Sequence, residues 1–337
     1  MKIAFIITSP IFVASDGVVS QALTWKTGLE NLGHEVILIN MWEKNDWKGF
    51  DIIHLFHFNE YMKDTINNIS KVNENIVLSP ILDPTFSIEK LKLFARWGSN
   101  RLRLTNKYHA LSSIHNKIKL VLIRSEFEKK YIVRGIGIAE DKCQVVPLAY
   151  KNSLLEINRE REPFCLHISL LTDERKNVKR LIDAAKKYNF KLILGGKLRN
   201  KEEVDLLNSW MDNNTNIEYH GYLSNEEKIS LYSRAKVFAL PSTNEGVGIV
   251  ALDAAAMGCD VVVTNLGGPK EYYSDMAIAV DPYSVDDIGK SIKKIIDGET
   301  FQPKLLEHIK NNYSLMSVSK KLLNKYTKIV NNSRLGE

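Results

Sequence analysis

The stretch from Pro241 to Val263 reads PSTNEGVGIVALDAAAMGCDVVV, and its order of elements decides the fold. It follows an apolar run and passes through a loop that contains Gly246 and Gly248. A run rich in Ala, Leu and Val comes next, and a second apolar run begins soon after Gly258. This pattern predicts strand, glycine-containing loop, helix, tight turn and strand. Such an order is typical of a parallel sheet whose connections are helices.

Similar apolar runs alternate with helical patterns along the rest of the chain. In the first half they lie at 3–7, 35–39, 51–56, 75–78, 120–123 and 143–146. In the second half they lie at 164–169, 191–194, 237–240 and 261–263. Continuous apolar strands are buried on both faces, so the sequence predicts an α/β protein of two Rossmann-like, doubly wound domains. We expect ligands beyond the carboxyl ends of the strands, in a cleft that the two domains face.

The expected domain boundaries follow from a polar stretch without periodicity, residues 150–163, which we interpret as the linker. It separates a domain over 1–150 from a domain over 163–314. The remaining segment, 315–337, is expected to form a helix that returns to the first domain.

Composition excludes several classes of protein. The 337 residues are 44% hydrophobic and 26% charged, with a net charge of +6, as is ordinary for a soluble globular chain. The three cysteines are far apart and form no C-x-x-C pair, which disfavours a disulfide framework and fits a reducing compartment. No apolar run is long enough to cross a bilayer, and Pro10 interrupts the apolar start, which favours a buried strand over a signal peptide. No H-E-x-x-H or similar cluster indicates a catalytic metal.

Glu245 carries the most specific chemical signal. It lies between a strand end and a helix start, where free N–H groups and the helix dipole favour a phosphate. Gly246 and Gly248 let the backbone approach a ligand closely, and Glu245 can accept hydrogen bonds from sugar hydroxyls beside that phosphate. Asp253 is expected within the helix, near another part of the same ligand. The alternative is ordinary turn chemistry, with Asp253 a partly buried helix residue.

The same segment resembles the donor-binding signature of glycosyltransferase family 4, retaining enzymes with the two-domain GT-B fold. The matching residues are Glu245, Gly246, Gly248, Ala254, Gly258, Gly267 and Gly268. Two positions depart from the signature: Asp253 replaces a second Glu, and Val247 replaces an aromatic residue. The resemblance covers nearly the whole chain, and it is most specific over 217–271.

The resemblance implies a nucleotide-sugar-dependent, hexosyl-type glycosyltransferase (EC 2.4). Its second domain would hold a UDP- or GDP-sugar, and its first would hold a glycan or lipid-linked acceptor. Glu245 would then contact the transferred sugar, Lys176 and Arg175 the diphosphate, and Asp253 the ribose. Many members carry a further Arg where this chain has Leu171, so Arg175 would supply the second cation. The remaining donor-binding residues are expected to be Gly17, Tyr222, Leu223, Asn244, Gly246, Val247, Gly248 and Ile249.

The acceptor side is less defined, because the His that many members carry after the fourth strand is missing. Asp83 lies in that region and could replace it, and Arg96 and Arg101 are further candidates. His54 and His57 flank a strand end, where a structural role is favoured over a catalytic one.

Residues 90–134 are strongly basic and contain interleaved apolar side chains. Three interpretations remain: a solvated helix face over the core, contact with an anionic membrane or acceptor phosphate, and nucleic-acid binding. Nucleic acid is the least expected of the three.

The expected setting is bacterial surface polysaccharide or lipopolysaccharide synthesis, in the cytoplasm and peripherally at the inner face of the membrane. No cofactor or metal is expected, since the nucleotide-sugar is a substrate and the protein's own cations take the place of a metal. The rival interpretations are a catalytically weak or inactive nucleotide-sugar-binding paralogue and another GT-B enzyme, such as a nucleotide-sugar epimerase.

Overall fold

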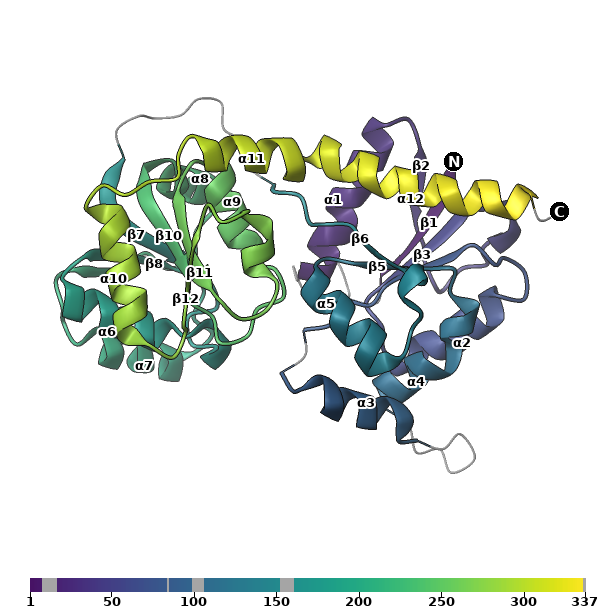
Figure 1. Cartoon of the computed structure of the whole chain (residues 1–337), viewed down its shortest axis with the longest axis horizontal. Helices are drawn as coiled ribbons and strands as arrows, with labels where there is room; N and C mark the ends of the chain where they lie inside the picture. The colour runs from purple at the N-terminus through teal and green to yellow at the C-terminus, as the bar shows by residue number, and fades with distance from the viewer. Residues whose placement is uncertain (8–16, 84, 99–105, 152–160, 336–337) are drawn as a thin grey trace. The chain divides into compact units, whose positions relative to one another are not determined.

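The structure is a computed structural model that describes residues 1–7, 17–83, 85–98, 106–151 and 161–335. The chain forms two compact units, Met1–Ala149 with Leu315–Glu337, and Tyr150–Ser314 (Figure 1). Each unit is built on one parallel sheet, and the predicted fold of two Rossmann-like α/β domains is confirmed.

The first unit has a six-stranded sheet with the order β2-β1-β3-β4-β5-β6. Its strands are β1 (Lys2–Ile7), β2 (Glu35–Leu38), β3 (Ile52–Phe56), β4 (Ile76–Ser79), β5 (Leu120–Ile123) and β6 (Cys143–Val145). Alternation along β1 sends Ile3 and Phe5 to one core, and Ala4 and Ile6 to the other. The sheet is therefore buried on both faces, as its continuous apolar strands predict.

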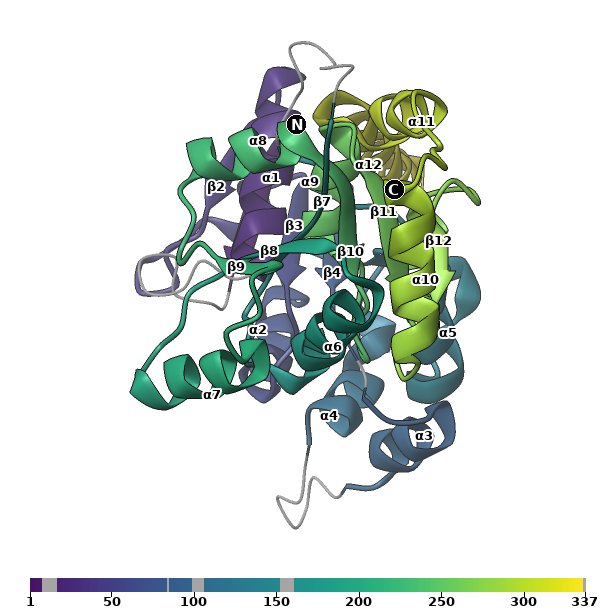
Figure 2. The ribbon, with the colours of Figure 1, turned by 90° about the vertical axis from the view of Figure 1, so that its left-hand side faces the viewer.

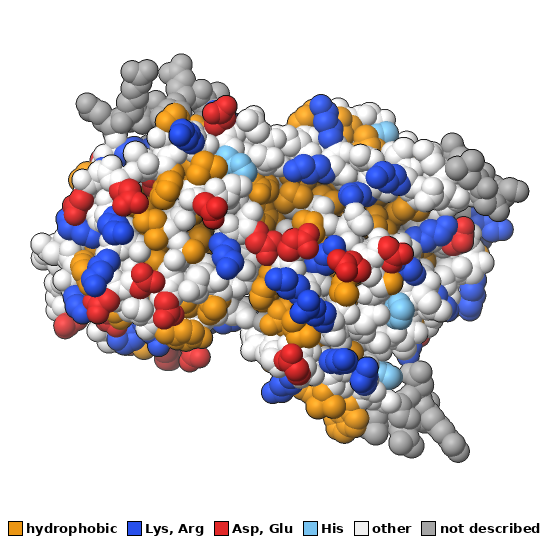
Figure 3. All heavy atoms as spheres, in the orientation of Figure 1, with side chains coloured by type: hydrophobic (Ala, Val, Ile, Leu, Met, Phe, Trp, Pro, Cys, Tyr) orange, Lys and Arg blue, Asp and Glu red, His pale blue; other side chains and the backbone are white. Residues whose placement is uncertain are grey.

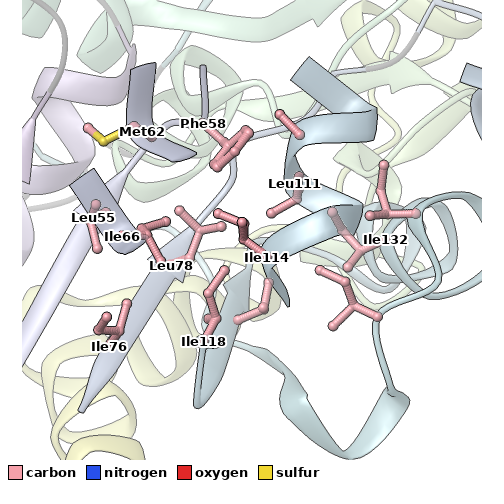
Figure 4. Packing of buried hydrophobic residues seen from close by; sticks show 14 of the residues in the cluster. Leu55, Phe58, Met62, Ile66, Ile76, Leu78, Leu111, Ile114, Ile118 and Ile132 are labelled. Atoms are coloured by element: carbon pink, nitrogen blue, oxygen red, sulfur yellow. The ribbon is translucent and has the colours of Figure 1, made fainter. Parts of the chain in front are cut away.

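Helices cover both faces of this sheet. They are α1 (Gly17–Asn31), α2 (Glu60–Ile69), α3 (Ile88–Arg96), α4 (Lys107–Ile114), α5 (Glu126–Lys130) and α12 (Leu315–Leu335). The C-terminal helix α12 packs beside α1, and its Val318, Leu322 and Tyr326 lie in the same core as Trp25. The opposite core is shown in Figure 4, where Met62 and Ile66 of α2 meet Leu111 and Ile114 of α4 over the strands.

The second unit repeats this plan with the strand order β12-β11-β10-β7-β8-β9. Its strands are β7 (Glu162–Ile168), β8 (Lys191–Gly195), β9 (Ile217–Tyr219), β10 (Ala235–Leu240), β11 (Asp260–Thr264) and β12 (Ile278–Val280). Sequence patterns missed β9 and β12, which are three-residue strands at the two edges of the sheet. Strand β7 begins at Glu162, inside the stretch that the sequence indicated as linker.

The helices of the second unit are α6 (Val178–Tyr188), α7 (Lys201–Met211), α8 (Asn225–Arg234), α9 (Ile249–Ala256), α10 (Val285–Ile296) and α11 (Lys304–Tyr313). Helices α6 and α10 lie side by side on one face of the sheet in both ribbon views (Figures 1 and 2). Helix α9 connects β10 to β11, so its first turn lies at the carboxyl ends of the central strands. This is the edge of the sheet where doubly wound folds bind ligands.

Candidate functional site

The loop from Pro241 to Gly248 is held by two glycines with left-handed backbones. Gly248 has φ 76°, and a Cβ there would lie 2.6 Å from Cδ2 of Leu240. Gly267 has φ 81°, and a Cβ there would lie 2.3 Å from the carbonyl oxygen of Glu245. A side chain at either position would displace the loop, so the two glycines fix the backbone that carries Glu245.

The structure brings together Glu245 and Lys176. The family resemblance implied that Glu245 contacts the sugar and that Lys176 contacts the diphosphate. Nζ of Lys176 lies 2.6 Å from Oε2 of Glu245, and the hydroxyl of Ser242 donates to the same oxygen over 3.3 Å. The Lys176 and Glu245 side chains are 21% and 14% exposed, so the pair is largely sheltered but open to a ligand. An acid and a cation thus lie side by side at the start of α9.

Asn177 holds the segment of Lys176 against this loop. Its backbone is left-handed, with φ 60°, and its side chain is buried. Nδ2 donates to the carbonyl oxygens of Pro241 (2.8 Å) and Pro282 (2.6 Å). One side chain therefore connects the starts of the loops after β10 and β12 to the turn that carries Lys176. Sequence reasoning missed this residue, although an Asn directly before a helix is a recognisable turn signal.

Arg175 has a different environment from its neighbour. Its guanidinium donates two hydrogen bonds to the carboxylate of Asp173, from Nη2 to Oδ2 (2.6 Å) and from Nε to Oδ1 (3.1 Å). The Arg175 side chain is 53% exposed. The hydrogen bonds from Arg175 hold the pKa of Asp173 below its ordinary value. The carbonyl oxygen of Arg175 accepts a hydrogen bond from the N–H of Thr243 (2.8 Å). This bond connects the turn of Arg175 to the loop of Glu245.

Asp253 lies within α9, as predicted, and is buried. Its Oδ1 accepts a hydrogen bond from the backbone N–H of Lys151 over 2.7 Å. Asp253 was predicted to contact the ribose. Its Oδ1 therefore already has a hydrogen-bond partner among the described residues.

The other predicted residues of the loop differ in burial. Val247 is buried, whereas Asn244, Gly246 and Ile249 are half-buried. The N-cap residue of α9 is Gly248, which has no side chain that could cap the helix. The first turn of α9 directly follows the loop that carries Glu245, and the backbone N–H groups of a helix's first turn are the ones that an anion can bind.

Tyr222 and Leu223 follow β9. Tyr222 is 71% exposed, with Nζ of Lys228 5.7 Å from its ring centre. Leu223 is buried against Gly195, where a Cβ would lie 2.3 Å from Cδ1 of Leu223. A groove of about 440 Å³ also lies here, and it is lined by Tyr219, His220, Leu223, Glu227, Ser230, Leu231 and Arg234. Neither Lys176 nor Glu245 lines it.

Among the candidates of the first unit, Asp83 has a clear ionic partner. Its Oδ1 lies 2.6 Å from Nη2 of Arg124, whose Nε is 3.0 Å from Oε2 of the buried Glu128. Burial disfavours the charge of Arg124, but its attraction to Glu128 and Asp83 outweighs this cost and raises the pKa of Arg124 above its ordinary value. Asp83 is thus anchored after β4.

The remaining first-unit candidates are less constrained. Arg96 is exposed in the last turn of α3, and Arg101 lies outside the described residues. Gly17 begins α1, and no described atom lies within 4 Å of the place its Cβ would take. Packing against the described residues therefore gives no reason for a glycine at position 17.

His54 is a core residue of β3, in line with the favoured structural role. It is buried, its Nδ1 lies 2.6 Å from the hydroxyl of Tyr326, and its Nε2 lies 2.9 Å from that of Ser79. Burial lowers the pKa of His54 well below its ordinary value. His57 follows β3 with φ 62°, and its N–H donates to the carbonyl oxygen of Ser79.

The described residues contain no group of three or more His, Cys, Asp or Glu side chains that could hold a metal ion. Cys143, Cys165 and Cys259 are free and buried. Among the described helices, none combines the length and the apolarity that a membrane span requires.

The family model that matches the chain is described as Glycosyl transferases group 1, and it covers residues 156–314. This range lies within the second unit and contains Lys176, Glu245 and Asp253. The similarity to this family therefore falls on the second unit.

Curated relatives extend this similarity. The O-antigen chain mannosyltransferase B of Escherichia coli is 27% identical over 214 residues, which is 56% of this chain and 55% of that protein. The chain thus matches just over half the length of this relative. An uncharacterized glycosyltransferase of Methanocaldococcus jannaschii is 26% identical over 83% of this chain and 84% of its own.

A solved structure shows the same fold. It is a glycosyltransferase from Rickettsia africae, with a TM-score of 0.75 and 18% identity over 98% of this chain and 99% of that one. The domain model and the curated relatives support a glycosyltransferase, and the structural neighbour supports the two-domain architecture.

Proposed function

We propose that this protein is a retaining glycosyltransferase that moves a hexosyl group from a nucleotide diphosphate sugar to a glycan or lipid-linked acceptor. The observation that carries this proposal is the Lys176–Glu245 pair at the start of α9. A nucleotide diphosphate sugar needs two kinds of contact at one point, cations and N–H groups for phosphate and an acceptor for sugar hydroxyls. The pair and the first turn of α9 supply both.

In the proposed reaction, the bond between the anomeric carbon and the diphosphate oxygen breaks while the acceptor oxygen bonds to the same face of the sugar. The proton of the acceptor hydroxyl goes to the departing diphosphate, so no protein nucleophile is required. Lys176 and the N–H groups of α9 stabilise the charge on the leaving group, and we propose that they do so without a metal. Glu245 accepts hydrogen bonds from the sugar and orients it.

The Lys176–Glu245 pair must exchange partners when the donor binds. Each side chain satisfies the charge of the other in the structure, where Nζ and Oε2 are 2.6 Å apart. On binding, the ammonium turns to the diphosphate and the carboxylate to the sugar hydroxyls, so neither charge loses its partner. Arg175 and Asp253 are proposed as supporting contacts to the diphosphate and the ribose.

The proposed donor is a UDP- or GDP-hexose, and the proposed setting is bacterial surface polysaccharide or lipopolysaccharide synthesis. The similarity to an O-antigen chain mannosyltransferase supports this setting. We place the reaction in the cytoplasm, at the inner face of the membrane. The three free, buried cysteines suit a reducing compartment.

Contact with an anionic membrane surface is part of the proposal, and we assign this contact to α3. Several cations of 90–134 already have partners within the first unit: Lys117 with Asn67, Lys119 with Glu74, Lys129 with Glu140, and Arg124 with Glu128. Helix α3 differs, because Lys90, Lys92 and Arg96 are exposed there. Leu93 and Trp97 beside them are 62% and 74% exposed.

The space-filling view supports this assignment, since hydrophobic and basic side chains adjoin over α3 (Figure 3). Exposed aromatic and aliphatic side chains next to cations suit the interface of an anionic bilayer, where each cation contributes about 1 kcal/mol. A lipid-linked acceptor would be found at the same surface.

The direct test of the proposed function is a thermal-shift panel of UDP-, GDP- and ADP-hexoses. A ligand that binds only the folded state stabilises it by mass action, by about 2.7 kcal/mol at a hundredfold excess over Kd. We expect one nucleotide series to raise Tm and to release nucleoside diphosphate on incubation. A rise in Tm without release of nucleoside diphosphate would favour the inactive paralogue. Conversion of the donor sugar without that release would favour an epimerase. The absence of any Tm shift with every nucleotide sugar would overturn the proposal.

A further inference from the structure

His167 is a buried titratable residue of β7 with two partners in the second unit. Its Nδ1 lies 2.7 Å from the carbonyl oxygen of Ala239 on the neighbouring strand β10. Its Nε2 lies 2.7 Å from the hydroxyl oxygen of Ser169, which follows the end of β7. The proposed reaction does not use either residue.

The two contacts determine which ring nitrogen carries the proton. A carbonyl oxygen only accepts hydrogen bonds, so Nδ1 must carry a hydrogen and donate it to Ala239. Burial, with a smaller contribution from the charge of Lys176, lowers the pKa of His167 to about 4. The ring is therefore neutral near pH 7, and its Nε2 carries a lone pair.

The direction in which the hydroxyl of Ser169 donates its hydrogen bond, which we call its polarity, follows from that tautomer. Because Nε2 has no hydrogen, the hydroxyl of Ser169 donates to it. The hydrogen of Ser169 is then directed toward the histidine, and the outer side of Oγ presents only lone pairs. Such an oxygen accepts a hydrogen bond from a ligand but repels the oxygens of a phosphate.

Ser169 lies at the same end of the sheet as the Lys176–Glu245 pair. Strand β7 is parallel to β10, and Leu166 is in register with Phe238, so Ser169 stands level with Pro241, where the loop of Glu245 begins. Ser169 is half-buried, and a Cβ on Gly196 would lie 2.1 Å from its carbonyl oxygen. The serine is thus held at the carboxyl edge that binds ligands in this fold.

We propose that Ser169 is an acceptor in the donor site, that it takes a hydrogen bond from a hydroxyl of the nucleotide sugar, and that His167 is the positioning residue that sets its polarity. This inference rests on the proposed function and names a specificity-determining contact for it. The hydroxyl belongs to the transferred sugar or to the ribose, and both donate in the same way.

The first experiment compares Ser169→Ala with wild-type protein by calorimetry, using the nucleotide sugar chosen by the thermal-shift panel and its nucleoside diphosphate. Loss of one hydrogen bond should weaken binding about three- to tenfold. If the sugar supplies the hydroxyl, Ser169→Ala should lose affinity only for the nucleotide sugar. If the ribose supplies it, the variant should lose affinity for both ligands, and its affinity for the 2′-deoxy nucleotide should equal that of wild type. Equal affinities of both proteins for both ligands would overturn the proposal.

The second experiment separates positioning from a structural role of His167. In His167→Gln the side-chain oxygen can still accept from Ser169, whereas His167→Asn keeps only the donor toward Ala239. The readout is the affinity ratio between the hydroxyl ligand and its deoxyfluoro analogue, because fluorine cannot donate. We expect wild type and His167→Gln to prefer the hydroxyl about three- to tenfold, and His167→Asn to lose much of this preference. A ratio that is the same in all three proteins would show that His167 acts only through stability.

Nitrogen-15 NMR of the labelled ring provides a readout that needs no ligand and no variant activity. The proposal requires a hydrogen on Nδ1 and none on Nε2, and a hydrogen on Nε2 would overturn it. The failures are distinguishable: if wild-type protein binds no nucleotide, the proposed function fails and this inference falls with it. If wild type binds and Ser169→Ala binds equally well, only the present inference fails.

Discussion

Gly267 packs against Glu245 so closely that a Cβ on Gly267 would lie 2.3 Å from the carbonyl oxygen of Glu245. The glycine follows β11, whereas Glu245 follows β10. The position of the acid therefore depends on a backbone contact between two loops, and this contact does not involve the side chain of Glu245.

The contact predicts that Gly267→Ala will displace Glu245. We expect a loss of about 1–3 kcal/mol in the free energy of unfolding, from overpacking added to the left-handed backbone, and a lower rate of transfer. Gly33→Ala is the matched control, because Gly33 has φ 82° but no described atom within 4 Å of a Cβ. Urea unfolding of both variants checks the prediction, and equal losses would show that the Glu245 contact is unimportant.

Lys176→Ala should weaken the binding of nucleoside diphosphate far more than that of the free nucleoside. A charged hydrogen bond to phosphate contributes about 1.5–3 kcal/mol, so a tenfold or greater loss is expected. Lys179→Ala is the control, since Lys179 is exposed three residues later and pairs with Asp183. Calorimetry with both ligands decides this, and a similar loss for nucleoside and diphosphate would mean that Lys176 acts through the fold.

Asn177→Ala should destabilise the second unit, because it leaves the carbonyl oxygens of Pro241 and Pro282 without their shared donor. We expect a loss of about 1–3 kcal/mol beyond the cost of a left-handed alanine. Asn189→Ala carries the same backbone cost, since Asn189 has φ 48° at the end of α6. Denaturant unfolding measures the difference, and no excess loss for Asn177 would contradict the bridging role.

The membrane proposal predicts that Trp97→Ser reduces co-sedimentation with vesicles that contain anionic lipid. Binding should also fall with added salt, because the cations of α3 are screened. Trp42→Ser serves as the control, since Trp42 is 96% exposed elsewhere in the first unit. Equal binding by the two variants, or binding that ignores lipid charge, would count against α3. Salt-sensitive DNA binding instead would favour the nucleic-acid interpretation.

Local patterns predicted the fold and the center of the candidate site, because strand, loop and helix are adjacent in sequence around Glu245. Interactions across the sequence escaped prediction. Asn177 reaches Pro241 and Pro282, which are 64 and 105 residues away, and His167 reaches Ala239 over 72 residues. No spacing rule signals such bonds. The pairing of Arg175 with Asp173 spans only two residues, and the sequence D-x-R could have indicated it.

The central claim is that Glu245 orients the sugar of a bound nucleotide diphosphate sugar. Its most direct test is the rate of nucleoside diphosphate release from the donor chosen by the thermal-shift panel, measured with water as the acceptor for wild type and Glu245→Gln. The account predicts a fall of about 10²–10³ in that rate, as for the loss of a transition-state electrostatic contact, with the affinity for nucleoside diphosphate retained. Near-normal release by the variant would contradict it.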